Sequence, residues 1–457
     1  MTGPVPIAQV VQALDLALVE RQRWFRHKGR ASAGFEVVDG WPVMYGGSFH
    51  GWWLLLRVPL DTVSTLYQMP VVLSDDPDTP LPRLGELAWA GRTCFVYDGG
   101  CDTIMVSDLV ARIQQRRTFP VKKGIVQPET FDSTSLLSAR VDFVEPNSSN
   151  TICRLNGRLL FKLYRCLDEA GRREADLLSA LARQGIGGIP SVKAVVSYSG
   201  GDGALLALAL VQEWVSEGED AWRWLTGVLL RGPQPLDAEI ECMAEAVTAI
   251  HRGLIGIGSR SWTEHDTRSL KGRIREQIAR LHELKGGETS SPLRGDLEAA
   301  LSRMELIEVG EPGVASPVHG DLHLGQMLRQ RDRYLILDFE GEPLASPEAR
   351  LAWHSPLKDV AGMLRSFDYA AAYARRQGAP GTTDEWERWE RRAETVFLEA
   401  YGHRMCETLG LRAEACAGLL SLYLLEKATY EIGYELQSRP DWVDIPLNGL
   451  RRVLRYT

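Results

Sequence analysis

The spacing of the apolar residues changes near residue 218 of this 457-residue chain, and this change restricts the possible folds more than any other feature. Before it, from about residue 35, short apolar or alternating runs are separated by Gly, Pro and Asp, a pattern typical of strands. After it, apolar residues recur at the spacing of amphipathic helices almost to the last residue. Strands gathered in the first half and helices in the second predict an α+β fold with two lobes, joined near residues 212–218.

The β-rich half contains two groups of predicted strands, separated by a polar connector. The first group, with a predicted amphipathic helix over 7–24, forms an N-terminal module of residues 1–134. The second group, in residues 135–216, is predicted to run strand, turn, strand, helix and then two more strands. The predicted elements are the strands Trp52–Val58, Tyr67–Leu73, Thr93–Tyr97, Arg140–Val144, Arg158–Tyr164, Val192–Ser197 and Leu205–Trp214, and the helix Arg172–Arg183.

The helical half, residues 217–457, is interrupted by one short β-like run, Tyr334–Phe339. Thr382 and Glu385 have the spacing of a capping box, which places a helix start at this point. The predicted helices cover 221–229, 237–253, 267–284, 294–307, 356–376, 383–405 and 411–437.

Composition excludes several classes of protein. The 52 Lys and Arg against 60 Asp and Glu leave a net charge of −8, which argues against a broad nucleic-acid surface. No apolar stretch approaches the roughly 18 residues of a membrane helix, and the N-terminus lacks a secretory signal pattern, so we expect a cytoplasmic protein. The seven cysteines are scattered without a CxxC pair and are expected to be isolated thiols. His319 and His323 have zinc-ligand spacing but lack a third ligand.

The stretch Pro317–Leu328 carries the clearest chemical signal. Phosphoryl transfer needs a carboxylate that orients the attacking hydroxyl and accepts its proton, and oxygen ligands that hold Mg²⁺ on the nucleotide phosphates. Asp321, in a polar loop, suits the first role. Gln326, five residues later, and Asp338, at the end of an apolar strand, suit the second. The alternative is that Asp321 caps a helix and Asp338 ends a buried strand by chance.

These motifs resemble those of a known family. His319–Gln326 with Asp338–Pro343 looks like the catalytic and metal loops of kinases with the protein-kinase-like fold, in their aminoglycoside-phosphotransferase branch. Together with Ser355–Ser366 and Glu426–Glu435, they resemble the bacterial maltokinases and the related actinobacterial glucosamine kinases more closely. Arg21–Phe25 is similar to part of the extra N-terminal cap module of that family.

The resemblance implies a bilobal, aminoglycoside-phosphotransferase-like fold with a β-rich cap in residues 1–134. It further implies nucleotide-binding strands in 135–216, and a catalytic loop and sugar site in 217–457. It also implies transfer of a phosphoryl group from ATP, with Mg²⁺, to a small sugar. Neither a nucleic acid nor a membrane is expected as partner, and the chain is expected to be a monomer or a small homo-oligomer.

Nucleotide binding would use a small polar turn, because the chain has no Gly-rich phosphate loop. The family that this chain resembles has a small polar loop, Ser-Asn-Thr, at this place. Ser149, Asn150 and Thr151 match that loop, and such side chains can hydrogen-bond phosphate. Lys162, in an otherwise apolar strand, is the candidate phosphate lysine. Because an unpaired Lys would be costly there, Glu174 on the next helix is its expected partner. The alternative for Lys162 is an edge-strand lysine that faces solvent.

The adenine site is implied by resemblance to kinase hinges, at the end of the apolar run that closes the β-rich half. There the backbone at Glu213 and Val215 would hydrogen-bond adenine. The alternative is a plain strand end.

The acceptor site is predicted on the helix 411–437. Tyr430 with Tyr434, and Glu431 with Glu435, form two adjacent stripes on that helix. Aromatic faces stack on the C–H faces of sugars, and carboxylates accept hydrogen bonds from sugar hydroxyls. The alternative places the tyrosines in the core and the glutamates in solvent. Trp442 is a second possible stacking platform, and Arg365 and Asp359 are expected to orient the catalytic loop or the sugar. His319, also a candidate on the substrate side, is expected to brace the catalytic loop through backbone hydrogen bonds.

Which sugar is phosphorylated is not decided by spacing. Glu431 with Glu435 suits the amine of glucosamine, which would become glucosamine 6-phosphate, whereas Tyr434 with Trp442 suits a disaccharide. The overall likeness, including the Ile445–Leu447 tail, favours a maltokinase that makes maltose 1-phosphate. A glucosamine kinase is the alternative, followed by an aminoglycoside-type phosphotransferase or a non-catalytic pseudokinase.

Overall fold

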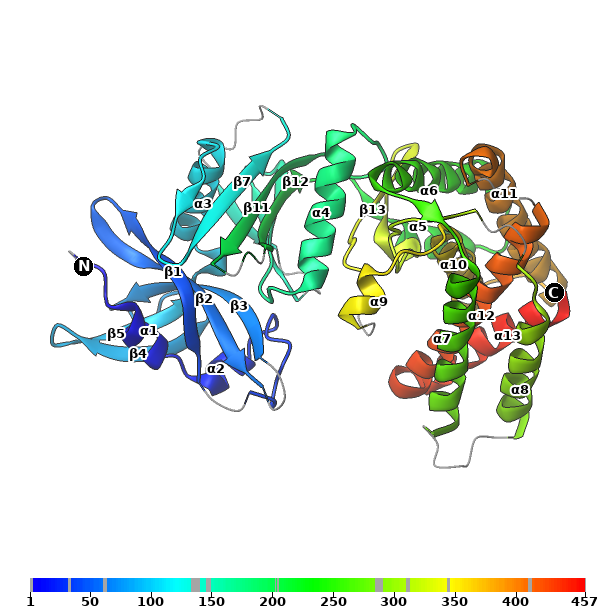
Figure 1. Cartoon of the computed structure of the whole chain (residues 1–457), viewed down its shortest axis with the longest axis horizontal. Helices are drawn as coiled ribbons and strands as arrows, with labels where there is room; N and C mark the ends of the chain where they lie inside the picture. Colours follow the sequence, from blue (N-terminus) through cyan, green and yellow to red (C-terminus); the bar gives the residue numbers. More distant parts are fainter. Residues whose placement is uncertain are drawn as a thin grey trace. The chain divides into compact units, whose positions relative to one another are not determined.

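The computed structural model describes residues 3–31, 34–60, 64–132, 140–144, 149–201, 203, 205–283, 291–309, 313–342, 346–409 and 413–456. The chain divides into two compact units. Unit 1 contains residues 1–183 and 190–216, and unit 2 contains residues 184–189 and 217–457. The two large sheets belong to unit 1 and the long helices α6, α7, α10, α11 and α12 belong to unit 2 (Figure 1).

The first sheet of unit 1 is antiparallel and has the strand order β1-β2-β3-β5-β4. It contains all three strands predicted before residue 100. Its strands are β1 Glu36–Tyr45, β2 Ser48–Pro59, β3 Ser64–Ser74, β4 Arg83–Trp89 and β5 Arg92–Asp98.

The predicted single helix over 7–24 is wrong, because the chain forms two short helices, α1 Ile7–Gln12 and α2 Leu16–Glu20. Between them Leu14 pairs with Gly85 of the sheet edge in a β-bridge, which takes its backbone out of the helical path. The Asp15 side chain then caps α2 by accepting a hydrogen bond from the Ala17 amide at 2.8 Å.

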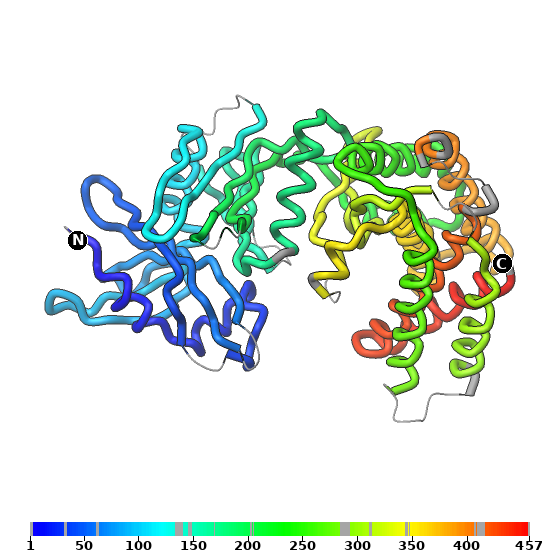
Figure 2. Tube along the Cα trace, in the orientation of Figure 1, coloured from blue at the N-terminus to red at the C-terminus, as the bar shows by residue number. Residues whose placement is uncertain are grey.

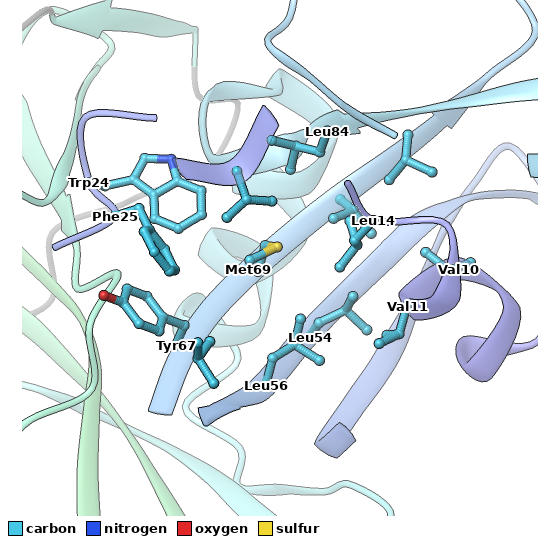
Figure 3. Packing of buried hydrophobic residues seen from close by; sticks show 14 of the residues in the cluster. Val10, Val11, Leu14, Trp24, Phe25, Leu54, Leu56, Tyr67, Met69 and Leu84 are labelled. Carbon is cyan, nitrogen blue, oxygen red and sulfur yellow. The ribbon is translucent and has the colours of Figure 1, made fainter. Parts of the chain in front are cut away.

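These helices cover one face of the sheet through a hydrophobic core (Figure 3). Val10, Val11 and Leu14 pack with Leu54, Leu56, Tyr67 and Met69 of β2 and β3, together with Trp24 and Phe25. Burying side chains of this size stabilises the fold by roughly 1.5–3 kcal/mol each. The sheet therefore depends on the N-terminal 25 residues for its cover.

The second sheet of unit 1 is antiparallel as well, with the strand order β6-β7-β11-β12-β10-β9-β8. The four strands predicted in residues 135–216 are present. The connector is not all loop, because β6 and β7 form there and β7 pairs with β11. The sheet thus runs across residue 134, and the division at that residue stays a prediction. Its strands are β6 Phe119–Pro120, β7 Gly124–Thr130, β8 Val141–Val144, β9 Thr151–Leu155, β10 Leu159–Leu163, β11 Val192–Gly200 and β12 Leu205–Glu213.

Two helices accompany this sheet. The predicted helix is α4, Glu169–Arg183, which packs on β11 and β12. The helix α3, Thr103–Gln114, was not predicted. It starts at Asp102, whose carboxylate accepts hydrogen bonds from the amides of Ile104 and Met105 at 3.0 and 2.9 Å. The short 3-10 turn η1, Gly99–Cys101, precedes it.

Unit 2 confirms the seven predicted helices, with ends that differ by a few residues, and adds α9 and α13. The capping box is present, with the Thr382 amide donating to Glu385 Oε2 at 2.7 Å. Its helices are α5 Ala221–Leu229, α6 Asp237–Ile257, α7 Glu264–Glu283, α8 Ser291–Leu306, α9 Pro347–Leu351, α10 Leu357–Arg376, α11 Thr383–Leu409, α12 Ala413–Ser438 and α13 Asp444–Tyr456.

The main non-helical stretch of unit 2 contains residues 313–342 and is yellow in Figure 2. It consists of β15 Val314–Ala315, a loop, the 3-10 turn η2 Leu324–Gln326, and the hairpin of β16 Met327–Gln330 and β17 Arg333–Ile336. The hairpin pairs with β13, Glu219–Asp220. The remaining short elements are β14 Arg260–Ser261 and the 3-10 turn η3 Pro440–Trp442.

None of the helices in the described part of the chain combines the length and the apolar character that a membrane span requires. The six cysteines whose side chains are described form no disulfide, as expected from their scatter.

Candidate active site

The loop between β15 and β16 in unit 2 carries Asp321, the predicted base. The side chain of Asp321 is 17% exposed, and its Oδ1 accepts a hydrogen bond from Lys427 Nζ at 3.0 Å. Burial alone would raise the pKa of Asp321, but Lys427, His323 and His319 together hold it below its usual range. Asp321 is therefore ionised at neutral pH, as a proton acceptor must be.

Asp359, near the start of α10, holds the backbone of this loop. Its buried carboxylate accepts hydrogen bonds from the amides of His319 and Gly320 at 2.7 and 2.8 Å, and from His251 Nε2 at 3.0 Å. Burial would raise the pKa of Asp359, but His251, His319 and the Gly320 amide lower it well below its usual range. A charged, fully bonded carboxylate thus fixes the residues just before Asp321.

His319 is completely buried, and both ring nitrogens are used inside the loop. Nε2 donates to the Leu337 carbonyl at 2.7 Å, and Nδ1 accepts from the Asp321 amide at 3.3 Å. The ring thus braces the loop through backbone hydrogen bonds, as predicted, and a contact of His319 with the substrate stays a prediction. It ties the catalytic loop to the strand end that precedes Asp338.

Gln326 and Asp338, the predicted metal ligands, lie side by side, with Gln326 Nε2 3.3 Å from Asp338 Oδ2. Leu337 N donates to the Gln326 carbonyl at 2.9 Å, which keeps the two residues adjacent. Asp338 has a φ of 62°, a left-handed conformation in which Asp is enriched.

The donor set of Gln326 and Asp338 fits Mg²⁺. Among the residues described, no cluster of three or more His, Cys, Asp or Glu side chains could hold a metal. Mg²⁺ bound to a nucleotide does not need one, because one or two protein oxygens, waters and phosphates complete its shell. A half-turn of the Gln326 amide would present its oxygen beside the Asp338 carboxylate.

Lys162 on β10 and Glu174 on α4 form the expected ion pair in unit 1, with Lys162 Nζ 2.7 Å from Glu174 Oε2. Their side chains are 11% and 3% exposed. The Tyr164 hydroxyl donates to the same carboxylate oxygen at 2.6 Å. A lysine in an otherwise apolar strand is thus neutralised and oriented by the helix that follows.

The polar turn is bonded to residues that sequence reasoning missed. Arg26 Nη2 donates to Ser149 Oγ at 2.9 Å, and Arg165 Nη1 donates to Thr151 Oγ1 at 3.2 Å. Both hydroxyls accept in these bonds, so each can still donate its own hydrogen to a phosphate oxygen. Asn150 is buried.

The contacts of Arg165 extend into the N-terminal residues of unit 1. Its guanidinium, completely buried, binds both oxygens of Asp98 at 3.0 and 3.1 Å and lies 3.9 Å from the centroid of the Trp24 ring. Trp24 Nε1 donates to Asp98 at 2.7 Å. The only sequence signal for this network was the Arg21–Phe25 likeness.

At the predicted adenine site, the Glu213 amide donates to the Ser191 carbonyl at 2.8 Å within the sheet. Glu213 could therefore serve adenine only through its carbonyl. The Val215 amide makes no hydrogen bond to any residue that the structure describes. The Glu213 carbonyl could thus accept one hydrogen bond from adenine, and the Val215 amide could donate one to it.

On α12, the structure brings Tyr430 to the catalytic loop together with Lys427, which sequence reasoning missed. Lys427 Nζ lies 5.1 Å from the centroid of the Tyr430 ring and 3.2 Å from Glu342 Oε1. A small polar cavity beside the loop is lined by Gln277, Gly320, Leu322, Glu342, Lys358, Gly362, Tyr423, Glu426, Lys427 and Tyr430.

The two predicted glutamates of α12 are engaged in ion pairs. Arg365 is 2% exposed and donates to Glu431 Oε2 at 2.9 Å. Glu435 is 1% exposed and accepts from Arg439 at 2.6 Å and from the Tyr369 hydroxyl at 3.1 Å. Arg365 and Glu435 are thus nearly buried and paired with charged partners, and their role as direct sugar ligands stays a prediction. Glu431 keeps a 12% exposed side chain.

Tyr434 and Trp442 form a separate aromatic group at the end of α12. The Arg439 guanidinium lies 5.6 Å from the centroid of the Tyr434 ring and 4.8 Å from that of Trp442. Tyr434 is 42% exposed. Within the described part of the chain, their aromatic contacts are with Arg439, Tyr373 and Arg376 and not with the loop that carries Asp321.

Fold and site together describe a phosphotransferase. The model of the "Phosphotransferase enzyme family" matches residues 142–393, more than half of the chain, so the chain belongs to this family. The model of the "Maltokinase N-terminal cap domain" matches residues 19–102.

Two glucosamine kinases are similar in sequence. The one from Mycolicibacterium smegmatis is 29% identical over 400 residues, which cover 84% of this chain and 95% of that protein. The one from Streptacidiphilus jiangxiensis is 28% identical over 303 residues, 63% of this chain and 66% of that protein.

The solved structure of a glucosamine kinase in complex with glucosamine, ADP and inorganic phosphate superposes with a TM-score of 0.75. It is 20% identical and the match covers 99% of this chain and 100% of that one. Together with the family match, this confirms the predicted fold, an α+β kinase-like fold of the aminoglycoside-phosphotransferase type with an N-terminal cap.

Proposed function

We propose that this protein is an ATP- and Mg²⁺-dependent sugar kinase that phosphorylates glucosamine at its 6-hydroxyl. The observation that carries the proposal is the ionised, rigidly held Asp321 on the loop that also places Gln326 beside Asp338, in a chain of the phosphotransferase family. The named relatives support glucosamine over maltose. The preference thus moves from the maltokinase prediction to its alternative.

In this mechanism Asp321 accepts a hydrogen bond from the sugar hydroxyl and orients its oxygen toward the γ-phosphorus of ATP. The new oxygen–phosphorus bond forms as the bond to the leaving ADP oxygen breaks, and the hydroxyl proton passes to Asp321. Gln326 and Asp338 would hold Mg²⁺, which neutralises charge on the phosphates. Lys162 would contact the phosphates, oriented by Glu174.

The remaining nucleotide contacts follow from unit 1. Ser149 and Thr151 would donate their hydroxyl hydrogens to phosphate while accepting from Arg26 and Arg165. The Glu213 carbonyl and the Val215 amide would bind adenine. Asn150 would support the turn from its buried position.

The charge around Asp321 supports transfer to the 6-hydroxyl of an amino sugar. Lys427 lies 3.0 Å from the carboxylate that receives the proton. If the anomeric hydroxyl reacted, the ammonium on the neighbouring carbon would lie next to this cation. With the 6-hydroxyl at Asp321, the ammonium lies across the sugar ring, where like-charge repulsion is weaker. Tyr430 beside Lys427 would pack against the ring, and Glu431 would be the nearest carboxylate of α12 for a polar group.

Maltose is the second candidate acceptor, because the chain matches a maltokinase cap model. It does not separate the two sugars, because the glucosamine kinase structure superposes over 99% of this chain, the cap region included. Tyr434 and Trp442 would stack on a longer acceptor, but among the described residues their ring contacts are with Arg439 and Tyr373 and not with the loop that carries Asp321.

The test is ADP release with ATP and Mg²⁺ across glucosamine, maltose, glucose and an aminoglycoside. Wild type is compared with Asp321→Asn and with Asp332→Asn, the same change at an exposed turn. We expect turnover with glucosamine, a loss of about 100- to 10,000-fold in Asp321→Asn with nucleotide binding retained, and no change in Asp332→Asn.

The position of the new phosphate is read from phosphorus–proton coupling in the product. Coupling to the C6 protons is expected. Turnover with maltose alone would replace glucosamine as acceptor, and near-normal turnover of Asp321→Asn would remove this residue as the base.

A further inference from the structure

Lys427 on α12 has a place in the site that its sequence position does not suggest. Its ammonium lies between two carboxylates, 3.0 Å from Asp321 Oδ1 and 3.2 Å from Glu342 Oε1. The side chain is 15% exposed, and the three charged groups come from three separate segments of unit 2. A charge so desolvated must be matched by its neighbours.

The two carboxylates depend on Lys427 to different degrees. Glu342 has a second cation, because Lys358 Nζ lies 3.7 Å from its Oε2. Asp321 has none: within the part of the chain that the structure describes, Lys427 is the one Lys or Arg at ion-pair distance from it. The nearby imidazoles contribute less, since burial lowers the pKa of His323 and the His319 ring is bonded within the loop.

We propose that Lys427 is a positioning residue for the base, which keeps Asp321 ionised and aims its second oxygen at the acceptor hydroxyl. This inference rests on the proposed kinase function. With Oδ1 held by Lys427 and the loop backbone held by Asp359, the Oδ2 atom is the one left to meet the sugar. Lys427 acts through Asp321 and is not itself a catalytic residue.

The consequence concerns the acid side of the pH–rate profile. The groups that face the pair are His319 and His323 from the loop, Glu342 with Lys358 behind it, and Tyr430 and Glu431 from α12. Among the described residues, Lys427 supplies the full positive charge in contact with Asp321, and a neutral substitution removes it. Burial is then opposed mainly by His323 and His319, and the pH at which Asp321 is protonated should rise by roughly 1–3 units. Loss of the transferred proton from Asp321 between turnovers depends on the same shift.

The experiment compares kcat and kcat/KM for glucosamine from about pH 5 to 9 in wild type, Lys427→Met, Lys427→Gln and Lys427→Arg. Lys427→Gln keeps a hydrogen-bonding group between the carboxylates if Lys427→Met fails to fold. Lys358→Met is the matched control, because it removes one positive charge that touches Glu342 but not Asp321. Thermal unfolding is recorded for each variant.

We expect Lys427→Met and Lys427→Gln to move the acid side of the pH–rate profile, its acid limb, upward by about 1–3 pH units. We also expect both variants to lower the plateau value of kcat by about 10- to 100-fold and to leave the KM for ATP unchanged. Lys427→Arg should return the limb to its wild-type position. Lys358→Met should leave the limb unchanged. A limb that stays in place in both neutral variants, or moves equally in Lys358→Met, overturns the inference.

The two proposals fail in different ways. If wild type phosphorylates no sugar, the proposed function is wrong. The acid limb of the pH–rate profile is then measured from slow ATP hydrolysis, in which water accepts the phosphoryl group. If wild type phosphorylates a sugar and only the variants disagree, the role of Lys427 is wrong and the kinase function stands.

Discussion

Gly362→Ala is a test of how closely α10 supports the catalytic loop. Gly362 is buried on α10, and a Cβ added there would lie 2.2 Å from the Leu322 carbonyl oxygen, the residue after Asp321. Real Cβ atoms essentially never approach closer than 3.0 Å, so the contact must open by about 0.8 Å. The obstacle is a backbone atom, which cannot rotate away as a side chain can.

The expected effect is large on rate and modest on stability. A misplacement near 1 Å of a reacting group costs about 100-fold, so we expect kcat to fall roughly 10- to 100-fold. Overpacking costs about 1–3 kcal/mol, partly offset by about 0.5–1 kcal/mol from replacing a helical glycine. The net loss of about 0–2.5 kcal/mol leaves a folded protein, given an ordinary stability of about 5–15 kcal/mol.

Two glycines provide controls in the same unit. Gly272 on α7 has no atom within 4 Å of an added Cβ, so Gly272→Ala should keep kcat and gain up to about 1 kcal/mol. Gly418 on α12 would place its Cβ 2.6 Å from the Glu308 carbonyl, away from the loop, so Gly418→Ala should lose stability and keep kcat. The assay is steady-state ADP release with urea unfolding. A Gly362→Ala enzyme within twofold of wild-type kcat would refute the reasoning.

Three further predictions follow from the buried charges. Lys162→Met should raise the KM for ATP by about 10-fold or more and leave the sugar KM unchanged, which ADP-release kinetics will show. Asp359→Asn should cost about 3–5 kcal/mol at neutral pH, because it leaves buried donors without a charge. Since the pKa of Asp359 is lowered by folding, this difference, measured by urea unfolding, should be present above about pH 4 and shrink below it. Burial, then Asp368, raises the pKa of Glu390 to about 7 despite its Arg452 partner. The folded state therefore holds that proton more tightly than the unfolded chain, so stability should fall by roughly 3 kcal/mol between about pH 4.5 and 8, and Glu390→Gln should flatten this slope.

Strong periodicity and the cost of buried charge were sufficient to predict much of this structure. The seven predicted helices of unit 2 and the strands around Lys162 follow from apolar spacing, and the Lys162–Glu174 pair follows from the penalty for an unpaired lysine. The elements that were missed have weak or broken patterns. β7 contains Pro128 in a polar stretch, and α13 begins with Asp444 and Pro446, which suggested a tail instead of a helix.

The contacts around Asp321 do not follow from apolar spacing, because the partners are remote in the chain. Lys427 was missed, and Asp359 was expected only to orient the loop or the sugar. Lys427 follows Asp321 by 106 residues, and Asp359 contacts the His319 amide from 40 residues away. The stripes of α12 show the same limit. Periodicity placed Glu431 and Glu435 on one face, but whether that face meets solvent, a sugar or Arg365 depends on which helices pack against it.

The helices α10 and α12 contact the loop around Asp321 in different ways. Asp359 binds the amides of His319 and Gly320, and Gly362, on the same face of α10, admits the Leu322 carbonyl. These contacts reach backbone atoms of the loop, so they set its path whatever side chains the loop carries. The Asp321 carboxylate is contacted instead from α12, where Lys427 projects as a side chain with Tyr430 beside it. Substitutions on α10 should therefore change the rate for every sugar alike, whereas substitutions on α12 should change the preference among sugars.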